Sequence, residues 1–207
     1  MALREIGDVD AATDWAKQAS DFDDGHQARR AAEYWCDLLA AHRPDELLEA
    51  RLQVFRRWPS STTAGRLYRD AGAAWPDYRD EVMARLASHP RDVVLFAQLS
   101  LNDIPYAWAL AHELGLDDDR TWSDLANAYE MIDPLAVLPV YSGLAERELA
   151  GPDARNYRSA ARRLKKMRAL AAGSPEAAAV DELIAELREK HRRRPRLQRE
   201  FDRAGLP

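Results

Sequence analysis

The chain has little of what several protein classes require: one cysteine, nine glycines and no long hydrophobic run. A single cysteine, Cys36, excludes an internal disulfide and a zinc site built from several cysteines. The longest unbroken apolar stretch, residues 135–141, is far too short to span a membrane. Arg4 and Glu5 interrupt the only apolar patch near the start, so we expect no signal peptide, no membrane and a cytoplasmic location.

The sequence also lacks the motifs of familiar active sites. Its five histidines are scattered, and it has neither a glycine-rich phosphate loop nor a Gly-x-Ser-x-Gly motif. The aspartate runs at residues 21–24 and 117–119 do not match a calcium loop, so we interpret them as loops and helix caps. Cys36 lies in a helical pattern and is interpreted as a buried structural thiol. We therefore predict no catalytic residue, no cofactor and no metal ligand.

What is abundant favours helix: Ala, Leu, Arg and Glu are common and β-branched residues are few. Five prolines recur at intervals of 14 to 17 residues, at positions 44, 59, 76, 90 and 105. Proline suits the first turn of a helix, and the stretches between these prolines carry apolar residues at helical spacing. We predict an all-α protein, an array of antiparallel helix hairpins of the TPR-like or α-solenoid type with about twelve helices.

Some helix assignments stay open at this level. Residues 93–101 are apolar enough to form a strand, although their neighbours favour a buried helix. The helix that follows Asp133 begins either at Pro134 or nearer residue 138, because Pro139 would kink a longer one. The six tryptophans are expected mainly to pack in the core. One face of the first helix is expected to hold Ala12, Trp15, Ala16 and Ala19.

The net charge of −5 divides unevenly along the chain. Residues 1–150 hold 15 basic against 27 acidic residues, a net of −12, and residues 151–207 hold 15 against 8, a net of +7. We therefore predict an acidic hairpin array over 1–150 and a basic C-terminal hairpin with a short capping helix over 151–207, packed as one continuous domain. The opposite charges indicate either a basic binding face or attraction between the two parts.

The basic hairpin supplies the candidate binding residues for an anionic partner. They are Arg158, Arg162, Arg163, Lys165, Lys166, Arg192, Arg193 and Arg194. These cations could track phosphates, or they could form a solvated face or pair with carboxylates. Few aromatic residues lie among them, which argues against base stacking and predicts weak nucleic-acid binding at most.

We therefore predict a non-catalytic scaffold that binds a protein or peptide partner. A nucleic-acid-associated helical module and an enzyme of unrecognised type are the alternatives. An apolar or aromatic concave groove would favour the scaffold, whereas a continuous positive stripe without acidic partners would favour nucleic acid. A deep pocket where buried carboxylates meet a histidine would favour an enzyme.

Two parts of the chain resemble a known bacterial family. They are EARLQVFRRWP at residues 49–59 with the apolar positions that follow, and NYRSAARRLKKMR at 156–168 with residues 183–206. Together they resemble the helical C-terminal region of bacterial SWIM zinc-finger proteins, over most of residues 25–207. The finger itself needs three cysteines and a histidine, so this chain lacks it, and the resemblance implies either a separate helical domain or a stand-alone relative. It supplies no function for any residue here.

Overall fold

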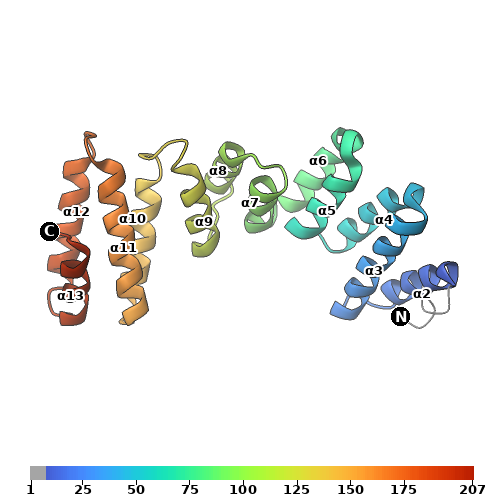
Figure 1. Ribbon diagram of the computed structural model, residues 1–207, viewed down its shortest axis with the longest axis horizontal. Helices are drawn as coiled ribbons and strands as arrows, with labels where there is room; N and C mark the ends of the chain where they lie inside the picture. The colour runs from blue at the N-terminus through green and yellow to red at the C-terminus, as the bar shows by residue number, and fades with distance from the viewer. Residues whose placement is uncertain (1–7) are drawn as a thin grey trace. The chain divides into compact units, whose positions relative to one another are not determined.

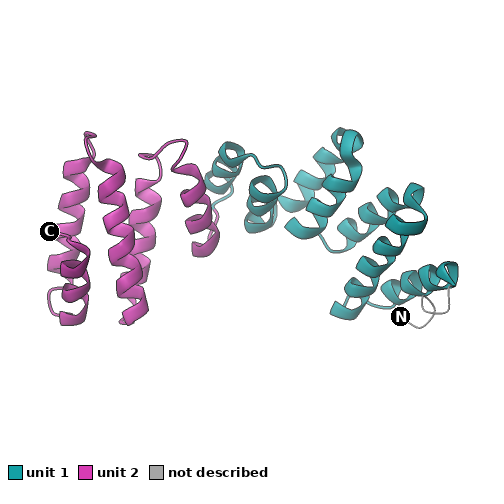
Figure 2. Ribbon diagram, viewed as in Figure 1, with its two compact units in different colours: residues 1–115 teal, residues 116–207 magenta. Residues whose placement is uncertain are grey.

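The structure, a computed structural model, describes residues 8–207, and within this range it contains helices and no strand. The predicted all-α fold is therefore confirmed. The chain forms two compact units, residues 1–115 and residues 116–207 (Figure 2). Arg4 and Glu5, on which the expected lack of a signal peptide rests, lie outside the described residues. No helix in the described part of the chain combines the length and the apolar character needed to cross a bilayer.

In the first unit, each helix packs mainly on its neighbours in sequence, and α5 also packs on α7 (Figure 1). This pattern fits the predicted array of helical hairpins. The elements are α2 (Val9–Asp21), α3 (His26–His42), α4 (Pro44–Arg57), α5 (Ser61–Ala71), the short 3₁₀ helix η1 (Gly72–Ala74), α6 (Trp75–Leu86), α7 (Pro90–Leu99) and α8 (Ile104–Glu113).

In the second unit, α11 is the central helix, because α10, α12 and α13 all pack on it, and α9 packs on α10 (Figure 1). The elements are α9 (Asp119–Tyr129), α10 (Leu138–Ala150), α11 (Ala154–Ala171), α12 (Ala177–Lys190) and α13 (Pro195–Ala204). The change from acidic to basic sequence at residue 150 therefore falls inside this unit, between the packed helices α10 and α11, and not at the division between the units.

The prolines act as helix starts, as predicted. Pro44 and Pro90 open α4 and α7, and Pro76 and Pro105 lie in the first turns of α6 and α8. A first-turn proline loses nothing, because its missing N–H would have no partner within the helix. Pro59 instead precedes the N-cap of α5, where Ser60 and Thr63 form a capping box.

The structure settles both open assignments. Residues 93–101 belong largely to α7, whose Val93, Val94, Phe96 and Ala97 are buried. Helix α10 begins at Leu138, so Pro139 lies in its first turn and introduces no kink. The expected face of the first helix was partly wrong: Ala12 and Ala16 are buried in α2, but Trp15 is 65% exposed and Ala19 is also exposed.

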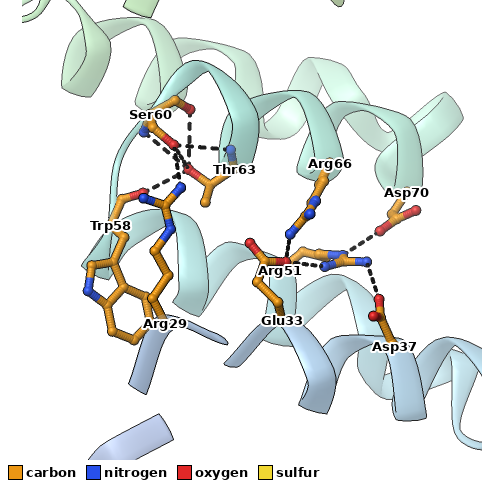
Figure 3. Close-up of polar contacts among 9 residues, drawn as sticks. All are labelled: Arg29, Glu33, Asp37, Arg51, Trp58, Ser60, Thr63, Arg66 and Asp70. Carbon is orange, nitrogen blue, oxygen red and sulfur yellow. Dashed lines mark hydrogen bonds and ion pairs between the residues drawn. The ribbon is translucent and has the colours of Figure 1, made fainter. Parts of the chain in front are cut away.

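A buried arginine joins three helices of the first unit. Arg51 of α4 is only 8% exposed and donates from Nε to Asp70 Oδ2 of α5 at 2.6 Å and from Nη1 to Glu33 Oε2 of α3 at 3.3 Å. Asp37 of α3 and Arg66 of α5 complete the cluster, Arg66 pairing with Glu33 (Figure 3). A buried guanidinium needs such partners, because its charge has been removed from water.

Cys36 belongs to the core beside this cluster. It is fully buried among residues of α2, α3 and α4, including Ala32, Leu39 and Val54. Burial raises the pKa of the Cys36 thiol to about 11. The thiol is therefore protonated at neutral pH, which agrees with the structural role expected from the sequence.

Arg51→Met should destabilise the protein by about 3 kcal/mol, at the low end for a broken buried ion pair because the carboxylates of Glu33 and Asp70 keep some solvent contact. Urea unfolding followed by circular dichroism measures this loss. Arg56→Met is the matched control, since Arg56 lies on the same helix but its pair with Glu81 is solvent-exposed. Equal effects of the two substitutions would contradict a structural role for burial of the Arg51 charge.

Leu164→Ala and Leu187→Ala should each destabilise the second unit by about 2–5 kcal/mol, the usual loss when a buried leucine site is emptied. The two side chains are 0% and 4% exposed. Met131→Ala is the control in the same unit, because Met131 is 85% exposed and its removal leaves no cavity. Losses below about 0.5 kcal/mol for either leucine would show that these residues do not form the core.

Candidate functional site

Helix α11 carries most of the candidate cations, and its two flanks have different surroundings. Asp153 caps the helix: its Oδ1 accepts from the backbone N–H of Arg155 at 2.6 Å and of Asn156 at 3.3 Å, and these bonds lower the pKa of the Asp153 carboxyl. The buried stripe of α11 includes Tyr157 and Leu164. Because residues three and four apart share a helix face, the cations form one row on each side of this stripe.

On one flank, Arg163 is held by groups of α9 and α10. Its Nη2 donates to Glu148 Oε1 at 2.9 Å and its Nη1 to Ser123 Oγ at 3.3 Å. The guanidinium also lies over the Tyr141 ring, 5.6 Å from the centroid. The Arg163 side chain is only 14% exposed, so its charge is neutralised inside the unit.

Lys166, on the same flank, joins a second polar cluster. Its Nζ lies 2.7 Å from Glu130 Oε2 and 2.8 Å from Asn127 Oδ1. The Tyr141 hydroxyl lies 2.8 Å from both of these oxygens. Burial, together with the hydrogen bond to Glu130, raises the pKa of Tyr141 above its ordinary range. This cluster ties α9, α10 and α11 together and serves as a structural element.

On the other flank, four exposed cations form a row that borders a groove. Arg155, Arg158, Arg162 and Lys165 follow one another at intervals of three, four and three residues, which places them on one side of α11. Within the described residues, the side chains of Arg155, Arg162 and Lys165 have no hydrogen bond or ion pair, and Arg158 only reaches the Ala154 carbonyl at 3.4 Å. Like charges this close repel one another, so an anion placed along the row would relieve that repulsion.

The groove lies between α11 and α13 and has a volume of about 540 Å³. Ala161 and Ala204 contribute its apolar surface, and their small side chains let a ligand approach the helices closely. Glu200 and Arg203 of α13 complete the lining. Glu200, the lining's carboxylate, pairs with Arg203 at 3.2 Å, so the row on α11 keeps its positive charge.

The arginines at 192–194 lie in the turn between α12 and α13, outside this groove. Arg194 Nη1 donates to the carbonyl of Leu149 at the end of α10 at 2.6 Å, and Arg192 pairs with Glu189. Arg193 is exposed. The structure therefore brings together three of the predicted site residues, Arg158, Arg162 and Lys165, and separates the others from them.

The site predicted from the sequence did not include three charged groove residues: Arg155, Glu200 and Arg203. Arg155 could have been found, because it continues the three-and-four spacing of the row by one more turn. Glu200 and Arg203 could not, because their place in the groove depends on how α13 packs on α11.

Comparison of the chain with protein-family models, with curated proteins and with solved structures finds no match in any of the three. The resemblance to the helical region of SWIM zinc-finger proteins therefore stays a prediction.

The Tyr141 cluster should make stability depend on pH in the alkaline range. The raised pKa of Tyr141 means that the folded protein keeps the phenol proton where an unfolded chain, with a pKa of about 10, releases it. The contribution of Tyr141 to the free energy of unfolding is thus complete below about pH 10 and is lost as the pH rises further. In urea unfolding, the free energy of unfolding of Tyr141→Phe should fall less steeply above that pH than that of the unchanged protein. Identical slopes for the two proteins would contradict a buried, hydrogen-bonded Tyr141 hydroxyl.

Proposed function

We propose that this chain is a non-catalytic protein-interaction module whose second unit binds an acidic segment of a partner protein in the groove between α11 and α13. The observation that carries the proposal is the contrast between the two flanks of α11. Arg163 and Lys166 on the flank that faces α9 and α10 have carboxylate partners, whereas no carboxylate among residues 8–207 pairs with the exposed row on the other flank. A cytoplasmic location is part of the same proposal, since a protein with one buried, unpaired thiol suits a reducing compartment.

The spacing of the cation row favours a helical ligand. The cation row extends from residue 155 to residue 165, which corresponds to about 15 Å along a helix axis. A partner helix with acidic side chains at the same three-and-four spacing would place one carboxylate near each cation. The alanines allow the partner's backbone to approach closely, which is the helix-in-groove mode of recognition.

The lining of the groove favours protein over nucleic acid. None of the lining residues is aromatic, so the groove offers no platform on which bases could stack. A protein segment can place an apolar side chain against the alanines and carboxylates against the cations, and so uses both kinds of surface.

The test is a fluorescence-anisotropy titration of the full chain with a labelled helical peptide of Ala and Glu, whose glutamates follow the three-and-four spacing of the row. We expect saturable binding that weakens as salt is added. Arg158→Glu combined with Arg162→Glu should weaken binding at least about tenfold, equivalent to about 1.4 kcal/mol. Lys190→Glu with Arg193→Glu is the matched control, because it makes the same charge change outside the groove and should leave the affinity unchanged.

Two further ligands distinguish the alternatives. A peptide with glutamine in place of each glutamate should bind poorly, and equal binding would show that charge is not what the groove recognises. A mixed-sequence DNA duplex and single strand should bind more weakly than the acidic peptide at physiological salt. Tighter binding of either nucleic acid, lost in the groove variant, would replace the proposal with the nucleic-acid function.

A further inference from the structure

Helix α2 of the first unit packs with its small residues inward and its largest residues outward. Its buried positions are Ala12, Thr13, Ala16 and Ser20. By contrast, Trp15 is 65% exposed and Phe22, at the end of the helix, is 88% exposed. This is the reverse of the usual amphipathic arrangement, in which the large apolar side chains face the core.

The exposed aromatics lie on one continuous stripe. Trp15 and Phe22 are seven residues apart, two helical turns, so they share a face of the helix about 10 Å apart along its axis. Ala11 and Ala19 fall on the same stripe at helical spacing. An aromatic side chain offers a large apolar area to a partner, and a tryptophan at the centre of such a surface is a typical anchor of protein interfaces.

Acidic side chains follow one edge of this stripe. The side chains of Asp10, Asp14 and Asp21 are 89%, 69% and 64% exposed. Arg43 lies 3.6 Å from the carboxylates of both Asp10 and Asp14, and Arg57 lies 3.5 Å from that of Asp21. Both arginines approach from the body of the unit and are only 29% exposed, so the solvent-facing sides of these carboxylates stay available.

The local charge is negative even when Arg43 and Arg57 are counted with Lys17, because six aspartates face three cations. Residues 8–24 contain six aspartates and one basic residue, Lys17. The Lys17 ammonium lies 5.5 Å from the centroid of the Trp35 ring, on the side of the carboxylate row away from the aromatic stripe. The stripe is thus bounded by the packed α2–α3 interface on one edge and by carboxylates on the other.

We propose that this face of α2 binds a cationic amphipathic helix of another protein. Its apolar side would cover Trp15 and Phe22, and its lysines or arginines would lie along the aspartate row. The charge decides the occupant: two α2 faces packed together would bring like-charged rows into contact, and an anionic lipid surface would be repelled by the same carboxylates. This surface belongs to the first unit, and the proposal does not depend on the groove of the second.

The experiment uses the full chain and a labelled peptide of leucine and lysine whose leucines lie on one helical face, followed by fluorescence anisotropy. Trp15→Ala with Phe22→Ala should weaken binding at least about tenfold, and so should Asp10→Asn with Asp14→Asn. Leu99→Ala is the matched control: Leu99 of α7 is 72% exposed and lies off the α2 face, so affinity should not change. Circular dichroism should show unchanged helix content in every variant, because each substitution is at an exposed position.

Three results would overturn the proposal. One is equal binding of a peptide with the same composition in scrambled order, since that peptide has the charge but no apolar face. Another is unchanged affinity after loss of both aromatics. The third is a different occupant: concentration-dependent self-association in sedimentation, or binding to vesicles of anionic lipid, that is lost in the aromatic double variant.

Discussion

The ion pairs on the flank of α11 that faces α9 and α10 determine what the second unit presents to solvent. A helix with one apolar stripe can still roll by some degrees about its axis, because hydrophobic contact is not directional. The contacts of Arg163 with Glu148 and of Lys166 with Glu130 remove that freedom, since they require definite distances to α9 and α10. With one flank held in this way, the opposite flank and its row of cations are directed into the groove beside α13.

The first unit uses the same device with different residues. Arg51 joins α3, α4 and α5 through carboxylates on either side, much as the cations of α11 join α9, α10 and α11. Among the helices of residues 8–207 no sheet or disulfide sets the register between neighbours, and apolar stripes of alanine and leucine tolerate small shifts. Buried or half-buried ion pairs supply specificity of register, even where their net contribution to stability is small.

Much of the fold could be predicted because its signals are local. Proline placement and apolar spacing depend on a few neighbouring residues, and they correctly gave the helices from Pro44 to Glu113 and the buried stripe of α11. The orientation of Trp15 could not be predicted, because α2 has two stripes at helical spacing and the packing of small residues on α3 decides which faces inward. The role of Arg51 could not be predicted for a similar reason, since its partners lie 18 and 19 residues away on other helices.

The basic segment that holds the candidate site could be predicted, but which of its cations pair with carboxylates could not. Charge counts identified the basic segment, but the structure shows that the acidic residues 116–150 and the basic residues 151–207 fold into one unit and partly neutralise each other. Which cations remain free is a question of helix packing, and spacing alone does not answer it. The two proposed surfaces that result have opposite charge: the groove at Arg158 and Arg162 would take an anionic segment, and the α2 face at Asp10 and Asp14 would take a cationic one. Because one segment of uniform charge would fit only one of them, the two proposals together imply a separate partner segment for each surface.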